Sequence, residues 1–247
     1  MKSEFLFIGH RGTRTIFDEN TITAFEKAIE FGANCVEFDV RKTKDGELII
    51  LHDHTLDRTT KSSGLLENLS YNEIKEFRTK KRSDPIPLLS EVLKGLKGKT
   101  LFMIELKVNN IIQNVLNIIN NYTLLDDCIF SGRNLQELSE VKKFYPNSQI
   151  CYNITKGFDF NINDLLKFDK FKRFNIKPDF ISLTSNLITK KFIEICKAFS
   201  IKSLAWNFII YKDPISKMKS IIDLGIDGIL FDNHQNIPKI KRYFHET

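Results

Sequence analysis

Short apolar runs, rich in β-branched and aromatic residues, alternate along the chain with longer amphipathic stretches. The runs predict strands at 5–10, 35–41, 101–107, 128–132, 149–153, 180–184, 202–208 and 228–232. Apolar residues at helical spacing predict helices at 21–31, 88–97, 110–121, 134–144, 161–172, 189–199, 213–223 and 236–244. Eight strand–helix units in 247 residues are typical of an α/β TIM (β/α)8 barrel, and we expect residues 1–247 to form one barrel domain.

A further β-prone run at 47–52 follows the second strand without an intervening helix. Asp45-Gly46 lies between the two runs, and Asp-Gly in this setting is a hairpin signal. With the turn centred between these two residues, we expect residue 52 to pair with residue 39, which would bring His52 beside Asp39 at the barrel rim. Residues 53–87 then form a small insertion between the second and third barrel strands.

Polar groups interrupt or end several of the apolar runs. They lie in the segments GHRG (9–12), DENT (18–21), EFD (37–39), HD (52–53) and ELK (105–107). Burying a carboxylate or an imidazole among apolar residues is costly unless the group is paired or binds a metal. Because the cost recurs in several strands, we expect these groups to build one site.

Side-chain alternation along a strand places Glu37 and Asp39 on one face, and likewise Glu105 and Lys107. The alternate positions are apolar and suit packing under helices, so the polar set should point into the barrel near its C-terminal mouth, where barrel enzymes have their active sites. Three carboxylates without a Cys or His excess favour one hard divalent cation, Mg²⁺ or Ca²⁺, over zinc. Interior salt bridges, Glu105 with Lys107 or Glu37 with Arg11, are the alternative for each residue taken singly.

The remaining candidates carry charge or protons. Arg11 and Lys107 suit a phosphate. His10 and His52 both follow apolar strands at the predicted rim and suit acid–base chemistry near neutral pH. Trp206 lies near the end of its predicted strand, and both packing against a helix and lining a substrate pocket remain open for it.

Composition narrows the class of protein. Hydrophobic residues make up 42% of the chain, but the apolar runs are strand-sized, so we expect no stable membrane insertion. The first residues lack a signal-peptide pattern and the four cysteines stand apart, which favours a cytoplasmic protein with reduced thiols. Lysines spread along the chain account for the net charge of +6, and without a basic block they do not indicate nucleic-acid binding.

Together these motifs resemble the glycerophosphodiester phosphodiesterase family. The matching stretches are GHRGTRTIFDENTITAFEKAIEFGANCVEFDVRKTKDGELIILHD, TLDRTTKSSG, PIPLLSEVL and LFMIELK, followed by LAWNF and GIDGILFDN. The resemblance implies a TIM barrel with a small insertion after the second strand. It also implies metal-dependent hydrolysis of glycerophosphodiesters, such as glycerophosphocholine or glycerophosphoethanolamine, to glycerol 3-phosphate and an alcohol. In that case His10 and His52 are the catalytic pair, Glu37, Asp39 and Glu105 bind the metal, and Arg11 and Lys107 bind the phosphate.

Other interpretations stay open. We assign His10 as the acid and His52 as the base, and the nucleophile is either the glycerol 2-hydroxyl or water. A lysophospholipase D or a phospholipase C-like enzyme would use a similar site, although the mostly polar insertion favours a soluble small molecule. A homo-oligomer is also compatible with the sequence. Asp18 stands where the family usually has Pro, so we expect a looser entry to the first helix and an added carboxylate near the site.

Overall fold

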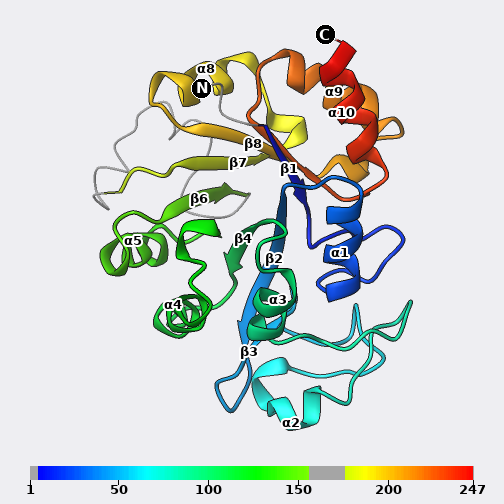
Figure 1. Cartoon of the computed structure of the whole chain (residues 1–247), viewed down its shortest axis with the longest axis vertical. Helices are drawn as coiled ribbons and strands as arrows, with labels where there is room; N and C mark the ends of the chain where they lie inside the picture. Colours follow the sequence, from blue (N-terminus) through cyan, green and yellow to red (C-terminus); the bar gives the residue numbers. More distant parts are fainter. Residues whose placement is uncertain (1–4, 156–175, 247) are drawn as a thin grey trace.

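The computed structural model describes residues 5–155 and 176–246. Eight parallel strands form a ring that closes where β1 pairs with both β9 and β2, so the TIM barrel expected from the strand–helix alternation is confirmed (Figure 1). The barrel strands are β1 (Leu6–Gly9), β2 (Cys35–Lys42), β4 (Leu101–Leu106), β5 (Cys128–Gly132), β6 (Gln149–Ile154), β7 (Phe180–Thr184), β8 (Lys202–Trp206) and β9 (Gly228–Phe231). A short strand, β3 (Leu48–Ile50), pairs antiparallel with β2.

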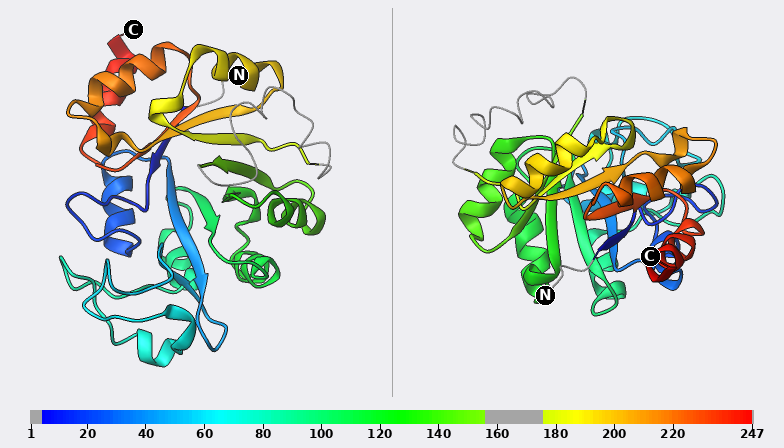
Figure 2. Two further views of the ribbon diagram at one scale, coloured as in Figure 1. Left: turned by 180° about the vertical axis from the view of Figure 1, so that it is seen from behind. Right: turned by 90° about the horizontal axis from the view of Figure 1, so that it is seen from above.

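Helices surround this ring, as Figure 2 shows from two sides. They are α1 (Ile22–Glu30), α3 (Leu89–Leu96), α4 (Ile112–Asn121), α5 (Leu135–Phe144), α8 (Lys190–Ala198), α9 (Pro214–Asp223) and α10 (Asn236–Glu246). The helix expected at 161–172 lies outside the described residues. In the described ranges, none of the helices combines the length and the hydropathy that crossing a bilayer requires.

Side-chain alternation along the strands separates two apolar layers. Val36, Phe38 and Val40 point outward and pack in the large cluster between the ring and its helices. Residues of the opposite face, among them Cys35 and Met103, fill the barrel interior. Glu37 and Asp39 share that inward face, as the alternation predicts, and they follow Val36, the residue of β2 that pairs with the last residue of β1.

The β2–β3 hairpin differs by one residue from the expected register. Leu51 donates its backbone N–H to the carbonyl of Asp39 at 2.9 Å, so residue 51, and not residue 52, is opposite Asp39. The turn has three residues because Thr43 and Glu47 are still bonded, and Gly46 takes the left-handed conformation, with φ of 91°, that such a loop requires. His52 nevertheless leaves β3 at the barrel rim.

The insertion follows this hairpin and has a small apolar core of its own, built on Leu56, Leu66, Ile74 and Ile86. It contains the short helix α2 (Tyr71–Ile74) and reaches α3 at the end of the segment. Asp18 does not loosen the entry to α1, because its carboxylate accepts hydrogen bonds from the Thr79 hydroxyl and from the backbone of Lys81 and Arg82. The expectation of an added carboxylate at the site was therefore wrong: Asp18 fastens the insertion to the β1–α1 loop.

Two local signals at α1 behave as their residue types predict. The Thr21 hydroxyl accepts a hydrogen bond from the backbone N–H of Ala24 and caps the helix. Gly32, with φ of 98°, ends it. At the other side of the barrel, β8 ends at Trp206 and does not continue to residue 208, because Asn207 turns left-handed with φ of 66°.

Candidate active site

A pocket opens at the C-terminal ends of the barrel strands. It is lined by His10, Arg11, Glu37, His52, Met103, Glu105, Lys107, Ser131, Arg133, Asn153, Thr155, Ser182, Trp206 and Leu230. Seven of the eight residues proposed from the sequence are in this set, and the eighth, Asp39, is ion-paired to two of them. Trp206 both lines the pocket and packs on the interior apolar layer of the barrel.

Glu37, Asp39 and Glu105 form a compact carboxylate cluster, with one oxygen of each within 4.8 Å of the others. Glu37 is 1% exposed; its Oε2 accepts the backbone N–H of Arg11 at 2.8 Å, and its Oε1 has no hydrogen-bond partner among the described residues. Burial, together with the charges of Asp39 and Glu105, raises the pKa of Glu37 well above its usual value. A hard cation would offset the repulsion among the three carboxylates and could bind the Oε1 atom of Glu37, so the residues present fit a divalent metal.

Two cations face the same cluster. Lys107 Nζ lies 3.0 Å from Asp39 Oδ1 and 2.6 Å from Glu105 Oε1, and Arg11 Nε lies 3.4 Å from Asp39 Oδ2. Burial alone would raise the pKa of Asp39, but Lys107 and Arg11 outweigh it and hold that pKa well below its usual range. Asn20 contributes an amide donor to Asp39 Oδ2 at 2.8 Å. The pocket therefore holds positive and negative groups side by side, as binding of both a metal and a phosphate requires.

The turn after β1 sets the position of Arg11. Arg11 and Gly12 are both left-handed, with φ of 52° and 74°. At Gly12 a Cβ would lie 2.6 Å from the Ala24 backbone, so only glycine lets this turn approach α1 so closely. The close approach directs the guanidinium of Arg11 between Asp39 and Glu19, whose Oε1 is 2.6 Å from Arg11 Nη1.

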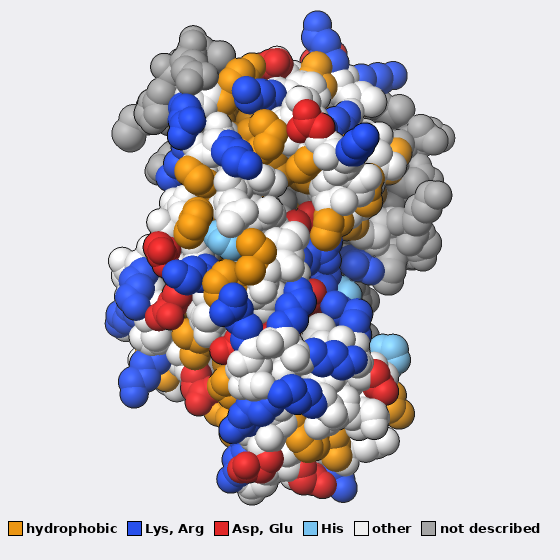
Figure 3. Space-filling model, turned by 90° about the vertical axis from the view of Figure 1, so that its right-hand side faces the viewer, with side chains coloured by type: hydrophobic (Ala, Val, Ile, Leu, Met, Phe, Trp, Pro, Cys, Tyr) orange, Lys and Arg blue, Asp and Glu red, His pale blue; other side chains and the backbone are white. Residues whose placement is uncertain are grey.

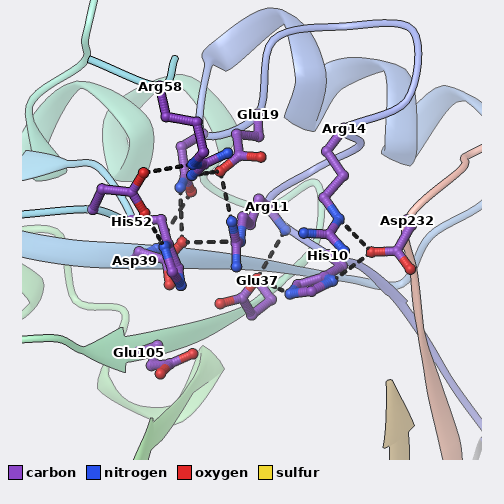
Figure 4. A network of polar contacts seen from close by, with 12 residues as sticks. His10, Arg11, Arg14, Glu19, Glu37, Asp39, His52, Arg58, Glu105 and Asp232 are labelled. Carbon is purple, nitrogen blue, oxygen red and sulfur yellow. Dashed lines mark hydrogen bonds and ion pairs between the residues drawn. The ribbon is translucent and has the colours of Figure 1, made fainter. Parts of the chain in front are cut away.

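Each candidate catalytic histidine has a carboxylate beside its Nδ1, and Figure 4 labels the one beside His10, Asp232. His10 Nδ1 lies 2.8 Å from Asp232 Oδ1, which also accepts from Arg14 Nε at 2.6 Å. The other ring nitrogen, Nε2, faces Glu37 at 3.9 Å. Burial opposes ionisation of Asp232, but His10 and Arg14 lower its pKa to about 2, so the carboxylate stays charged. A histidine that donates Nδ1–H to a carboxylate keeps Nε2 free for proton transfer.

The second histidine repeats this arrangement on the other side of the carboxylate cluster (Figure 4). His52 Nδ1 lies 2.6 Å from Asp53 Oδ1, and Arg41 Nε donates to the backbone carbonyl of His52 at 2.8 Å. Burial lowers the pKa of His52, and Lys107 and Arg11 act in the same direction, against the charge of Asp39. The ring is thus favoured in its neutral form, which can accept a proton.

Sequence reasoning missed the residues that hold these side chains. Asp53 and Asp232 received no role, although each directly follows a strand or hairpin that ends at the mouth. Glu19 and Asn20 were recognised only as part of a polar segment. A carboxylate next to a rim histidine was the available signal for Asp53, whereas Asp232 is 222 residues from its partner His10 and needed the closed ring to be found.

Charge is spread over the face of the molecule that Figure 3 shows. On the face shown in Figure 3, lysine and arginine side chains extend from one end of the molecule to the other and are interspersed with acidic ones. Lysine and arginine side chains are therefore not gathered in one part of the face that is shown.

Comparison with known proteins gives a consistent result. A glycerophosphodiester phosphodiesterase of Caldanaerobacter subterraneus subsp. tengcongensis is 30% identical over 250 residues, covering 96% of this chain and 98% of the relative. The crystal structure of a glycerophosphodiester phosphodiesterase from Thermotoga maritima superposes with a TM-score of 0.78 at 27% identity, covering 97% of this chain and all of that chain. An Oleispira antarctica phosphodiesterase, solved in complex with the product sn-glycerol-3-phosphate, shares the fold with a TM-score of 0.81 at 22% identity, covering 96% of each chain.

The model of the glycerophosphoryl diester phosphodiesterase family matches residues 10–236. That range includes every residue of the pocket described above. The resemblance inferred from the motifs is thereby confirmed: the chain belongs to the glycerophosphoryl diester phosphodiesterase family and is a phosphodiesterase.

Proposed function

We propose that this phosphodiesterase hydrolyses glycerophosphodiesters, such as glycerophosphocholine or glycerophosphoethanolamine, to glycerol 3-phosphate and an alcohol. The observation that carries the proposal is the pair of histidines, each backed by a carboxylate, on either side of three clustered carboxylates. The product found in the Oleispira antarctica relative supports this substrate class. Four free, buried cysteines agree with a cytoplasmic location, which we include in the proposal.

Glu37, Asp39 and Glu105 are the residues that would hold one divalent cation, Mg²⁺ or Ca²⁺. When bound, such an ion supplies positive charge to the non-ester oxygens of the phosphate. Arg11 and Lys107 add two fixed cations, 11% and 9% exposed, on the same side of the pocket. In a site this sheltered from water, they offset the charge that develops on the phosphoryl group more effectively than exposed cations would.

The histidines move the protons. His52, whose pKa is lowered, accepts a proton from the nucleophile through Nε2. His10, whose Nδ1 lies 2.8 Å from Asp232 Oδ1, donates a proton to the leaving alkoxide. Each transfer contributes about 10²–10⁴-fold to the rate. The nucleophile is either the glycerol 2-hydroxyl, which gives a cyclic phosphate that water then opens, or water itself.

A substrate panel tests this function. Purified protein is offered glycerophosphocholine and glycerophosphoethanolamine, and glycerol 3-phosphate is measured by a coupled dehydrogenase reaction. We expect release that stops after chelation and resumes when Mg²⁺ or Ca²⁺ is added. Turnover that persists in chelator would refute the metal-binding role assigned to the three carboxylates. If none of the glycerophosphodiesters in the panel released glycerol 3-phosphate, the proposed substrate class would be wrong.

One observation favours the lipid alternative. Ile209 and Ile210 follow β8 at the same mouth, beyond Trp206, and the two residues are 53% and 54% exposed. Exposed apolar side chains beside a polar pocket suit an acyl chain. Lysophosphatidylcholine belongs in the same panel for this reason, because release of choline and lysophosphatidic acid from it would identify a lysophospholipase D.

A further inference from the structure

The insertion carries a basic residue that none of the assigned roles uses. Arg58 lies in the stretch TLDRTT, outside the residues that line the pocket. Its Nη2 donates to Glu19 Oε1 at 2.7 Å, and its Nε donates to Asp53 Oδ2. One guanidinium therefore joins a carboxylate of the β1–α1 loop to a carboxylate of the insertion (Figure 4).

Each of these two carboxylates also contacts a residue that lines the pocket. The oxygen of Glu19 that receives Arg58 also accepts from Arg11 Nη1 at 2.6 Å. The other oxygen of Asp53 lies 2.6 Å from His52 Nδ1. The contacts thus form a continuous chain that runs from His52 through Asp53, Arg58 and Glu19 to Arg11.

We propose that Arg58 is a positioning residue, which fixes the ring of His52 and the guanidinium of Arg11 relative to each other through Asp53 and Glu19. The proposal rests on the proposed function, because it assumes that His52 transfers a proton and that Arg11 binds phosphate. Arg58 touches neither the substrate pocket nor the carboxylate cluster, so its effect on the reaction is indirect.

Charge supports this assignment. Glu19 is 9% exposed and Asp53 22% exposed at the side chain, so burial opposes ionisation of both. In each case the hydrogen bond from Arg58 is the largest influence against burial, and the pKa of each carboxyl is lowered to about 2. Without Arg58, each carboxylate would lose this hydrogen bond and would be held less firmly beside the residue that it orients.

The alternative is that Arg58 only attaches the insertion to the barrel. Other contacts already do so, because Asp18 accepts hydrogen bonds from Thr79, Lys81 and Arg82. Arg58 is itself 46% exposed, and ion pairs of exposed arginines contribute little to stability. A role in geometry therefore explains the placement of Arg58 better than a role in attachment.

The side-chain type is also specific. A guanidinium presents a planar fork of donors that can bind two carboxylates from two chain segments at once. A lysine ammonium is a single point of charge, so we expect it to hold one carboxylate and release the other. Arg58→Lys is therefore expected to lose much of the activity that Arg58→Ala loses, although it keeps the charge.

Kinetics on glycerophosphocholine with Mg²⁺ test the proposal. Misplacement of a catalytic group by about 1 Å can cost about 10²-fold in rate, so we expect Arg58→Ala to lower kcat by about 10–100-fold with a KM change of less than about threefold. Arg78→Ala is the matched control, because Arg78 lies in the same insertion and its Nη1 donates only to the backbone carbonyls of Lys75 and Phe77. We expect Arg78→Ala to keep the wild-type kcat, and added guanidinium ion at millimolar concentration to restore part of the kcat of Arg58→Ala.

A second readout does not depend on turnover. In ¹⁵N-labelled protein, the ring nitrogens of His52, identified by the signal missing in His52→Gln, should show Nδ1–H in the wild type and mixed tautomers in Arg58→Ala. If the wild type hydrolyses no glycerophosphodiester, the proposed function fails and the ring signals alone decide the role of Arg58. An unchanged kcat in Arg58→Ala, an equal loss in Arg78→Ala, or an unchanged His52 tautomer would overturn the positioning role.

Discussion

Replacing Asp232 with Asn tests whether a carboxylate is needed behind His10. The Oδ1 atom of Asp232 accepts from both His10 Nδ1 and Arg14 Nε, at 2.8 and 2.6 Å. Asparagine keeps an oxygen at this position, so the hydrogen bonds can persist while the negative charge is lost. His10 then loses the anion beside its Nδ1, and Arg14 is left without an ionic partner among the residues described.

The expected magnitudes follow from these contacts. A carboxylate-to-amide change behind a catalytic histidine lowers kcat by up to about 10⁴-fold where the tautomer is reversed. Because Arg14 Nε donates to the same oxygen as His10, it favours the amide oxygen at this position in Asp232→Asn, and we expect a smaller loss, about 10²-fold, with KM nearly constant. The pKa of Asp232 is lowered from 3.8 to about 2, and a shift of that size corresponds to about 2 kcal/mol of stability at pH 7.

The sign of the pH dependence is fixed by the direction of that pKa shift. The folded pKa lies below the unfolded one, so the carboxylate stabilises the fold above about pH 4, and this contribution is lost as the pH falls toward 2. Urea unfolding of wild type and Asp232→Asn at several pH values measures it, beside steady-state kinetics. A difference of the same size from pH 7 down to pH 2.5, or an unchanged kcat, would refute the reasoning.

Three further changes probe the pocket. His10→Ala and His52→Ala should each lower kcat by at least about 10²-fold, whereas His54→Ala, an exposed neighbour outside the pocket, should keep the wild-type rate in the same assay. Glu37→Gln should raise the melting temperature of the metal-free protein, because it removes one of three repelling carboxylates, and should abolish the rise on adding Mg²⁺; a lower metal-free value would contradict the repulsion argument. Gly12→Ala should lower the free energy of unfolding by about 1–3 kcal/mol or more in urea titration, because φ is 74° and the new Cβ meets the backbone of α1 at 2.6 Å; unchanged stability would show that the turn can relax.

Alternation made the carboxylates predictable. A strand must place every second side chain on one face, so the sequence alone assigns Glu37 and Asp39, within the run CVEFDV, to the barrel interior. The apolar positions between them pack under helices, as that assignment requires. The fold class was equally accessible, since it depends on the count and order of elements and not on their contacts.

The register between β2 and β3 was harder to predict, because it depends on the backbone conformation of a single residue, Gly46. Placing the turn between Asp45 and Gly46 assumed a two-residue loop, and the left-handed Gly46 makes it a loop of three. Such a change moves every partner along the returning strand by one. His52 still reaches the pocket because it lies beyond the last paired residue of β3, where the chain is no longer held to the alternation of the sheet.

The groups behind the histidines could not be predicted in full for a different reason. Asp232 directly follows the last strand and His10 the first, and only ring closure makes them neighbours. Asp18 shows the converse error, since a polar residue near a motif was expected at the site and instead binds the backbone of the insertion. Local sequence shows that a polar group is costly to bury, but the partner that offsets the cost is a property of the closed fold.

Each of the two histidines has an aspartate beside its Nδ1, but the two aspartates are held in place by different parts of the molecule. Asp232 is 3% exposed, at the end of a barrel strand, and Arg14 from the neighbouring β1–α1 loop holds it there. Asp53 belongs to the insertion, is more exposed, and depends on Arg58 from the same insertion. In the proposed mechanism, one proton-transfer group is therefore fixed by the barrel itself, and the other only when the insertion is in place. The proposal thus makes the polar insertion after β2 a part of the site, because it supplies both Asp53 and Arg58.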